Sequence, residues 1–543
     1  MPKKILACIL AAFFIAPLFS CRKNGAEANA SLIESAPGSE ENLPENPSDS
    51  DSDGDFFYYD SSSETSEDNP DPEIPVPPDD PGEIPEYDPP LEPDDPGEIP
   101  EYDPPLEPDD PESDDFNPDK FAFAASHGGF EIVSVYDSGY FEKSSYEFDP
   151  DLAFFAFSMA VADTGEGGMG NFFRNALFDN ARFYEYRSPH SDVAAHSIAH
   201  KKLRGGDLIA VSVRGFNYGN EWISNFDLGE SGHHKGFLSA AEIVYSNLLS
   251  YIELGGYGGD GLKIIVTGYS RGGGVANVLG AIVNDSASIS DRENVFVYTF
   301  EAPRGVSAER IAEDENIHNV ISSEDAVTHV APARYGFKRA GTDYNVYSAS
   351  YYSSAAFRKK YLSVTGAPAP VFRSRENFAS AAELYASLIV VLTGVPSDKN
   401  YVSIHTRSEY YANTQAHNGT PALGEAVSLI MNMSSRQREA FTEKLLGVFN
   451  TGIISLFLSL ENDENALYKK VRPALDNASV KYNSFNLYRY CGQLQQVMKT
   501  YLKTGGIGGV RLMIDVYNNV EYVAAMHYPE TVYILMRKSF SAS

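Results

Sequence analysis

Apolar residues beyond position 119 follow two alternating patterns that predict a mixed α/β fold. Short apolar runs, often β-branched, indicate buried strands, and longer stretches with apolar residues every three or four positions indicate helices. The expected strands cover 130–136, 207–213, 263–267, 295–300 and 317–322, and the expected helices cover 152–162 and 242–254. Because strands separated by crossover helices pair in parallel, we expect a mostly parallel sheet with ligands at the carboxyl ends of its strands.

The first twenty residues have the pattern of a secretory signal peptide. Lys3 and Lys4 precede an apolar run, Ile5–Phe19, that is too short to span a bilayer comfortably. The segment Leu18–Cys21 resembles a bacterial lipobox, which implies cleavage before Cys21 and acylation of its thiol. Acyl chains at this position would hold the protein on a membrane surface of the bacterial cell envelope. Plain secretion is the alternative.

Residues 21–118 differ in composition from the rest of the chain. They are rich in Ser, Asp, Glu and Pro, and the 15-residue sequence PDDPGEIPEYDPPLE occurs at 78–92 and again at 93–107. Proline at this density favours polyproline II and excludes regular helix. Since so few aliphatic residues cannot bury enough surface to offset the cost of ordering, we expect a disordered acidic tether.

The acidic charge of the chain is concentrated in this tether. The net charge is −34, and about 32 of the 76 Asp and Glu residues lie within 21–118. No basic stripe stands out in the remainder, which argues against nucleic-acid binding.

One segment of the tether has the residue spacing of a calcium-binding loop. The pattern D-x-D-x-D-G-x5-D is formed by Asp49, Asp51, Asp53, Gly54 and Asp60. No helical pattern flanks it, because Pro44 and Pro47 precede it and a run of serines follows. We therefore interpret the segment as acidic low complexity and expect no metal site.

Cysteine usage leaves no intrachain disulfide in the expected mature protein. The chain has three cysteines: Cys8 belongs to the signal, Cys21 would carry lipid, and Cys491 is left alone. Cys491 lies among tyrosines and leucines, so we interpret it as a buried small apolar residue rather than a nucleophile.

The segment Lys263–Ala276, KIIVTGYSRGGGVA, combines a strand pattern, a sharp turn and the start of a helix. The turn is a G-x-S-x-G sequence from Gly268 to Gly272 with Ser270 at its centre. Such a turn holds the serine hydroxyl clear of the backbone, and the free N–H groups of the following helix face any oxyanion formed there. Ser270 is therefore our candidate nucleophile. The alternative is a glycine-rich turn whose serine only caps the helix.

Five sequence blocks in order resemble the class 3 lipases, which have the α/β-hydrolase fold. They are LIAVSVRG at 208–215 followed by Trp222 and Phe226-Asp227; His234-Lys235-Gly236-Phe237; the turn at 268–273; Thr299–Arg304 (TFEAPR), similar to a TFGAPR strand end; and Asn319–Ala331. The resemblance covers about a quarter of the chain. It implies an α/β-hydrolase fold for residues 119–543 and hydrolysis of lipid esters.

The resemblance also implies the partners of the nucleophile. Asp325 stands at the position of the triad acid, with Glu324 as the local fallback. In the α/β-hydrolase order the histidine follows the acid, which leaves four histidines: His329, His405, His417 and His527. His329 is too close to Asp325 in sequence. We favour His527, which precedes a helix start at Pro529-Glu530, and keep His405 as the alternative base.

The expected oxyanion hole consists of two backbone N–H groups. One belongs to Arg271, directly after the nucleophile, and the other to Phe216, in the turn after Arg214-Gly215. The chain departs from the commoner residues of the family at three positions. Phe216 stands where Ser or Thr is usual, Tyr269 where His is usual and Arg271 where Leu is usual.

The region between Asp325 and His527 predicts a helical cap over about 379–510. Helical patterns cover 379–394, 422–433, 436–460 and 486–503. The part at 445–460 is strongly apolar. We interpret it as the core of the cap, with an acyl-chain or membrane-interface surface as the alternative. It is short for a transmembrane span and contains Asn450, Thr451 and Ser455.

Together these features predict an exported serine hydrolase that cleaves carboxylic esters without metal or organic cofactor. The resemblance implies that these are lipid esters. One alternative is a lipase-like surface lipoprotein that binds without catalysis, for which the departures at Phe216 and Tyr269 argue. Another is a peptidase or depolymerase that uses the same triad.

Overall fold

The computed structural model describes most of the chain from residue 107 to 372 and parts of the C-terminal region. The described residues are 107–372 apart from 114, 128, 189, 218–219, 260 and 287–288, and then 407, 429, 433–434, 436–437, 440–441, 444, 462–489, 491–492, 495, 519 and 521–540. All of them belong to one compact unit. The predicted signal peptide, Cys21, the calcium-like segment and the proline-rich repeats lie outside the described residues.

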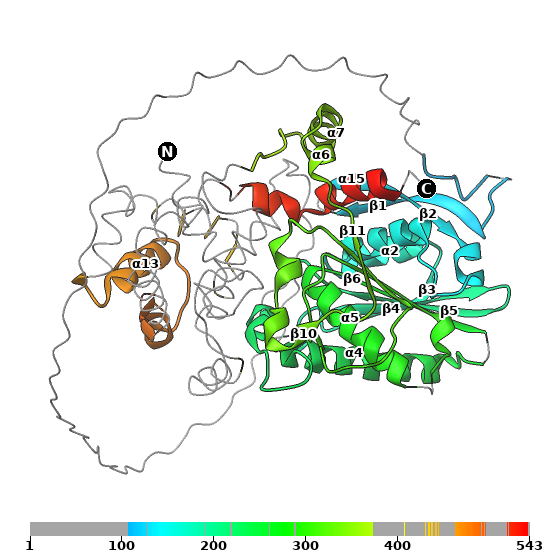
Figure 1. Cartoon of the computed structure of the whole chain (residues 1–543), viewed down its shortest axis with the longest axis horizontal. Coiled ribbons are helices and arrows are strands. Elements are labelled where there is room, and N and C mark those ends of the chain that lie inside the picture. Colours follow the sequence, from blue (N-terminus) through cyan, green and yellow to red (C-terminus); the bar gives the residue numbers. More distant parts are fainter. Residues whose placement is uncertain are drawn as a thin grey trace, which may run out of the picture. The chain divides into compact units, whose positions relative to one another are not determined.

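A seven-stranded sheet forms the centre of the fold (Figure 1). Its strands, in spatial order, are β11 (Thr342–Asn345), β9 (Ile317–Ile321), β7 (Val295–Phe300), β6 (Leu262–Tyr269), β5 (Gly206–Val213), β4 (His196–Leu203) and β3 (Asp179–Tyr184). The pairs from β11 to β5 are parallel, and β4 and β3 are antiparallel. The mostly parallel sheet expected from the sequence is thus confirmed, as are strands β5, β6, β7 and β9.

Strands β3, β4 and β11 were not among the sequence predictions, and burial explains why. Every residue of β7 and β9 is buried, which produces the continuous apolar runs of a sheet covered on both faces. In contrast, β3 lies at the sheet edge with mostly exposed residues, and β4 carries His and Lys residues. The edge strands therefore lack a clear hydrophobic pattern.

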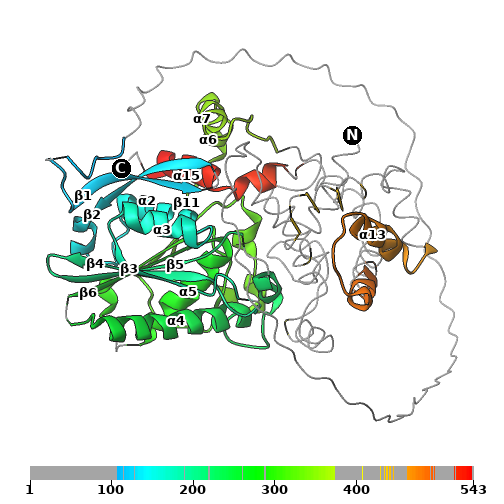
Figure 2. The same cartoon turned by 180° about the vertical axis from the view of Figure 1, so that it is seen from behind.

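Helices cover both faces of the sheet (Figures 1 and 2). Along β5 the side chains alternate: Leu208 and Ala210 join one hydrophobic cluster, while Ile209 and Val211 join another. The first cluster includes residues of α2 (Pro150–Ala162), α3 (Glu166–Asn175) and α15 (Pro529–Phe540). The second includes residues of α4 (Lys235–Gly255) and α5 (Ser270–Asp285). The fold therefore has a three-layer core.

Helix α2 is apolar on all sides because it is covered on all sides. One side packs on β6 of the central sheet, and another packs under a hairpin of β1 (Lys120–His127) and β2 (Phe130–Asp137). The helix begins with Pro150, and the Asp149 side chain accepts hydrogen bonds from the N–H groups of Asp151 and Leu152. The predicted strand 130–136 and helix 152–162 are both confirmed.

Helix α4 begins at Lys235, earlier than the predicted 242. The His234 imidazole is buried, which lowers its pKa to about 3, and in its neutral form it accepts a hydrogen bond from the Phe237 N–H at 3.3 Å. Gly236 allows a close approach, since a Cβ there would lie 2.0 Å from the carbonyl oxygen of Ser224. Phe237 is buried in the core. The sequence His-x-Gly-Phe therefore supplies a cap, a close contact and a core residue.

The strand register brings the carboxyl ends of four neighbouring strands to one edge of the sheet. Val213 of β5 is paired with Gly268 of β6, and Tyr269 at the end of β6 is paired with Phe300 at the end of β7. Phe300 is in turn paired with Val320 of β9. The residues that follow these strands therefore emerge together at one edge, where parallel sheets bind their ligands.

The remaining described elements are short. Strand β8 (Val306–Ser307) pairs with β10 (Phe337–Lys338), and two helices, α6 (Ala349–Tyr352) and α7 (Ala355–Thr365), follow β11. Helix α13 (Ala466–Asn477) lies within the predicted cap region. The predicted helices at 379–394, 422–433, 436–460 and 486–503 lie wholly or mostly outside the described residues, so the cap stays a prediction.

Cys491 is buried, and burial raises the pKa of its thiol to about 12, as expected for a structural rather than a nucleophilic cysteine.

None of the helices in the described part of the chain has the length and apolar character needed to cross a membrane.

Asp163 links α2 to the sheet and is expected to make folding depend on pH. Its carboxylate accepts hydrogen bonds from the hydroxyls of Tyr186 at 2.6 Å and Ser212 at 2.9 Å, yet burial raises its pKa to about 7. A carboxyl whose pKa is raised by folding contributes stability that is fully present below about pH 4 and is lost as the pH rises to about 7.

We expect the free energy of unfolding of the wild-type chain to fall between pH 4 and 8 relative to Asp163→Asn, by an amount on the order of 4 kcal/mol. Urea unfolding of both proteins at several pH values measures this difference. Glu131→Gln, at an exposed position of β2, is the control and should follow the wild type. Parallel pH curves for wild type and Asp163→Asn would show that Asp163 is ionised throughout.

Candidate active site

Ser270 lies on a strained turn between β6 and α5. Its φ angle is +54°, in the left-handed region that non-glycine residues rarely adopt, and its side chain is nearly buried. The two glycines of the turn touch: a Cβ on Gly268 would lie 2.3 Å from the carbonyl oxygen of Gly272. A side chain at either position would clash, which explains the glycine at both positions of G-x-S-x-G.

The same turn is pressed against the segment that follows β5. A Cβ on Gly272 would lie 2.2 Å from the carbonyl oxygen of Val213, and a Cβ on Gly215 would lie 1.9 Å from that of Tyr269. The two segments can come this close because each has a glycine at the contact, Gly272 in the turn and Gly215 after β5. The contact brings the backbone of the next residue, Phe216, beside the turn that carries Ser270.

His527 lies between Ser270 and Asp325. Its Nε2 is 2.8 Å from Ser270 Oγ, and its Nδ1 is 2.5 Å from Asp325 Oδ2. The His527 and Asp325 side chains are only 2% and 1% exposed. With a proton on Nδ1, the imidazole donates to Asp325 and accepts from the Ser270 hydroxyl. This is the arrangement in which histidine can remove the serine proton.

Tyr269 holds the backbone of His527 in place. Its hydroxyl donates a hydrogen bond to the carbonyl oxygen of His527 at 2.9 Å, and its ring lies edge-on to the imidazole at 5.5 Å between centroids. Helix α15 begins two residues later at Pro529 with Glu530 in its first turn, as predicted. Tyr269, which differs from the commoner residue at this position, thus links the turn that carries Ser270 directly to His527.

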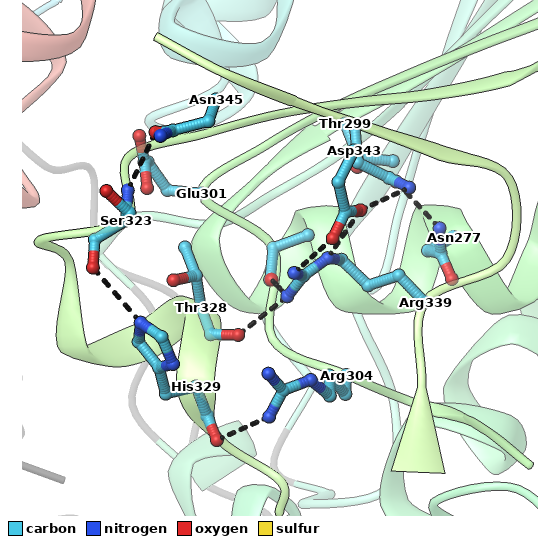
Figure 3. A network of polar contacts seen from close by, with 12 residues as sticks. Asn277, Thr299, Glu301, Arg304, Ser323, Thr328, His329, Arg339, Asp343 and Asn345 are labelled. Atoms are coloured by element: carbon cyan, nitrogen blue, oxygen red, sulfur yellow. Dashed lines mark hydrogen bonds and ion pairs between the residues drawn. The ribbon is translucent and has the colours of Figure 1, made fainter. Parts of the chain in front are cut away.

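The turn that carries Asp325 is held by several polar contacts. Asp325 Oδ1 accepts from the Val327 N–H at 3.0 Å and so caps a 3-10 turn, Ala326–His329. Two arginines bind backbone carbonyls of the same turn, Arg339 that of Thr328 at 2.6 Å and Arg304 that of His329 at 2.9 Å (Figure 3). Backbone and side chain of Asp325 are therefore both restrained, which fixes the carboxylate toward His527.

A second buried carboxyl, that of Glu301, lies next to Asp325. Both its oxygens are within hydrogen-bonding distance of the Ser322 N–H, at 2.9 and 3.0 Å. Burial and the neighbouring Asp325 raise the pKa of Glu301 well above its usual range. Sequence reasoning did not single out Glu301, although it stands at the glycine position of the TFGAPR-like block.

The two residues expected at the oxyanion hole lie on either side of the turn. The Phe216 ring stacks on Tyr269 with 4.9 Å between centroids, and Arg271 is the second residue of α5. The Arg271 guanidinium is turned into the protein, where it donates to the Val193 carbonyl at 3.0 Å and the Ser224 hydroxyl at 2.8 Å. Its side chain therefore connects the helix start to the 3-10 helix Asn220–Phe226.

A buried ion pair supports the segment after β5. Arg214 and Glu221 are 2.8 Å apart, and the other carboxylate oxygen of Glu221 accepts from the Ala195 N–H at 2.9 Å. This pair closes the loop that contains Phe216. Glu221 was missed by sequence reasoning, because an isolated acidic residue in a loop carries no signal of its distant partner.

The structure separates the candidates that the sequence left open. His329 lies in the Asp325 turn and its Nε2 is 3.1 Å from the Ser323 carbonyl oxygen. Of the two acids considered for the triad, Asp325 has its carboxylate oxygen Oδ2 at 2.5 Å from His527 Nδ1. His405 and His417 lie outside the described residues. Among the residues that the structure describes, no group of three His, Cys, Asp or Glu side chains could hold a metal ion.

The close approach at Gly215 makes a testable prediction. Gly215→Ala would push a methyl group into the Tyr269 carbonyl and displace the turn, so we expect the free energy of unfolding to fall by about 2 kcal/mol or more. Gly205→Ala is the control, since a Cβ there would have no atom within 4 Å. Thermal unfolding compares the two, and an equal melting temperature would contradict the close packing.

Comparison with known proteins relates this site to one family. Residues 210–335 match the model of the family described as Lipase (class 3). The secreted mono- and diacylglycerol lipase 1 of Fusarium solani is 29% identical over 148 residues, which are 25% of this chain. The matched region spans 43% of that relative, less than half of its length.

Several solved structures are also similar. A fungal lipase–inhibitor complex is 18% identical, with 37% of this chain and 81% of that chain covered and a TM-score of 0.31. The triacylglyceride lipase of Rhizomucor miehei is 23% identical, with 32% and 69% covered and a TM-score of 0.25. The mostly parallel seven-stranded sheet with helices on both faces is an α/β-hydrolase fold. Its segment 210–335, which contains Ser270 and Asp325, is similar to the class 3 lipases.

Proposed function

We propose that this chain is a serine hydrolase that cleaves carboxylic esters, with lipid esters as its substrates. The observation that carries the proposal is the hydrogen-bonded series from Ser270 through His527 to Asp325. The match of residues 210–335 to the class 3 lipases supports the ester as substrate.

In the proposed reaction Ser270 Oγ attacks the ester carbonyl while His527 Nε2 takes its proton. Asp325 keeps the imidazole in the tautomer that has its proton on Nδ1 and stabilises the imidazolium that forms. His527 then gives the proton to the leaving alcohol, which departs and leaves an acyl group on Ser270. A water molecule, deprotonated by His527, attacks this acyl-enzyme and releases the acid.

The negative charge that develops on the carbonyl oxygen would be held by the backbone N–H groups of Arg271 and Phe216. The position of Arg271 in the first turn of α5 supports this assignment. The first N–H groups of a helix have no partner within the helix, and they form the positive end of the helix dipole. The close approach of Gly215 to Tyr269 supports the second donor. Removal of one such donor typically reduces kcat by about 100-fold or more.

Substitution of the three residues tests the proposal. With the full chain and p-nitrophenyl esters of short and long acyl chains, Ser270→Ala, His527→Ala and Asp325→Asn should each lower kcat by about a thousandfold or more. The first removes the nucleophile, the second removes the base, and the third removes the carboxylate that holds the base in its reactive tautomer. His329→Ala and Glu324→Gln are matched controls from the same turn as Asp325 and should retain wild-type turnover. The acyl-length profile separates lipase from esterase.

Three results would contradict the proposal. Turnover that persists in Ser270→Ala would show that another group is the nucleophile. Loss of turnover in His405→Ala but not in His527→Ala would move the base to the alternative histidine. A folded wild type that cleaves peptides but no ester would favour the peptidase, and one that cleaves neither would favour a binding protein.

The N-terminal sequence supports a location for this activity. The lipobox-like Leu18–Cys21 and the signal-like residues before it favour export and attachment to a membrane through acylated Cys21. In a bacterial host the wild-type chain should partition into the detergent phase of Triton X-114, and Cys21→Ser should not. Equal partitioning of both proteins would contradict the anchor and leave secretion without lipid.

A further inference from the structure

The carboxyl group of Glu301 is a buried acid beside Asp325 to which the proposed reaction gives no role. It follows the last residue of β7, as Ser270 follows the last residue of β6, and it is fully buried. Its carboxyl group lies within interaction range of that of Asp325. Both its oxygens contact the N–H of Ser322, whose carbonyl in turn accepts from the Asp325 N–H at 3.1 Å. Glu301 is therefore one contact removed from the imidazole of His527.

The backbone at Glu301 is strained. Its φ angle is +47°, which a glycine adopts freely but which costs an L-residue about 1 kcal/mol or more. Ser270 shows the same type of backbone at the end of the adjacent strand. A glutamate kept at a position where glycine would fold more easily indicates that its side chain has a use.

The charges around Glu301 determine its protonation. The groups that face it are Asp325, Arg339 and Tyr269. The Arg339 guanidinium makes two hydrogen bonds, at 2.9 and 2.6 Å, to the Asp343 carboxylate and also binds backbone carbonyls (Figure 3). Its positive charge is thus paired mainly with the Asp343 carboxylate rather than with Glu301. The Tyr269 hydroxyl donates to the His527 carbonyl and is not ionised.

Two adjacent buried carboxyls cannot both be ionised without a large cost, so one of them holds a proton. Asp325 already accepts on both of its oxygens, on Oδ2 from His527 Nδ1 and on Oδ1 from the Val327 N–H. Among the described residues, the Ser322 N–H donates to Glu301, and burial disfavours the charged form of this carboxyl. The proton therefore belongs on Glu301.

We infer that Glu301 is a positioning residue for the triad: its neutral carboxylic acid donates a hydrogen bond to the Asp325 carboxylate and thereby fixes that carboxylate toward His527. One oxygen accepts from the Ser322 N–H, and the other carries the proton given to Asp325. The inference rests on the proposed function of Ser270, His527 and Asp325. It adds to them a fourth residue, Glu301, which directly follows strand β7.

The neutral acid has an effect opposite in sign to that of an ionised one. A hydrogen bond donated to Asp325 disperses part of its negative charge and makes His527 easier to deprotonate. Removal of the donor should therefore move the acid limb of the activity profile to higher pH. If Glu301 were ionised, its removal would take away a negative charge and move the same limb to lower pH.

Two substitutions at Glu301 test the inference. Glu301→Gln keeps an acceptor for Ser322 and a donor for Asp325, so kcat/KM should stay within about threefold of wild type with an unchanged acid limb. Glu301→Gly removes the side chain but suits the left-handed backbone. We expect it to fold, to lose about tenfold or more in kcat/KM and to shift the acid limb upward by about half a pH unit. Glu324→Gln is the control and should match wild type.

A purely structural Glu301 would give a different pattern: Glu301→Gly with wild-type kcat/KM and pH profile would overturn the inference. A downward shift of the acid limb in either variant would also overturn it, because that shift requires an ionised glutamate. If the wild-type chain hydrolyses no ester, the proposed function fails first.

A measurement that needs no turnover keeps the two failures distinct. The infrared spectrum of the wild-type protein at neutral pD should contain a carboxylic-acid C=O band that Glu301→Gln lacks. Asp163→Asn is the matched control, because burial raises the pKa of Asp163 to about 7, so that this acid also holds protons near neutral pH. Identical bands in wild type and Glu301→Gln would show that Glu301 is ionised and would overturn the inference, whether or not the chain is active.

Discussion

The contact between the Ser270 turn and the end of β5 is the constraint on which the rest of the site depends. Ser270 can keep a left-handed backbone only if its surroundings prevent relaxation, and the surroundings here are backbone atoms. Gly215 approaches the Tyr269 carbonyl, and Gly272 approaches that of Val213. Because these backbone contacts restrain both segments, the position of Ser270 relative to the segment with Phe216 is fixed.

The histidine reaches this edge of the sheet from the far end of the chain. His527 is 257 residues beyond Ser270, and it is held by Asp325, by Ser270 and by the Tyr269 hydroxyl. Helix α15, which follows, buries residues such as Ile534 and Leu535 in the cluster that also contains α2. Since the cost of closing a loop grows slowly with its length, a long insertion between acid and histidine is compatible with a precise site.

The sequence predicted those parts of the fold whose signal is local. The fully buried strands β6, β7 and β9 appear as apolar runs, and Ser270 is marked by its two glycines. Asp325 and His527 could be predicted only through the resemblance to a family. The two residues are 202 positions apart, and nothing in the sequence around either one shows that His527 Nδ1 lies 2.5 Å from Asp325 Oδ2. Edge strands such as β3 left no pattern, since their side chains face solvent.

The supporting residues could not be predicted for the same reason. Glu301 resembles an ordinary acidic residue at a strand end until its burial and its neighbour Asp325 are known. Tyr269 and Arg271 are visible in the sequence as departures, but their roles depend on distant backbone acceptors, the carbonyls of His527 and Val193. Each departure from the family pattern therefore marks a residue with a contact far away in the sequence.

The central claim is that Ser270 is a nucleophile activated by His527. Covalent trapping tests it most directly: the folded full-length chain is treated with a fluorophosphonate, and the adduct is located by mass spectrometry of its peptides. The account predicts one adduct, on Ser270, that forms far more slowly in His527→Ala. A folded chain that takes no adduct, or takes it at another residue, would contradict the account.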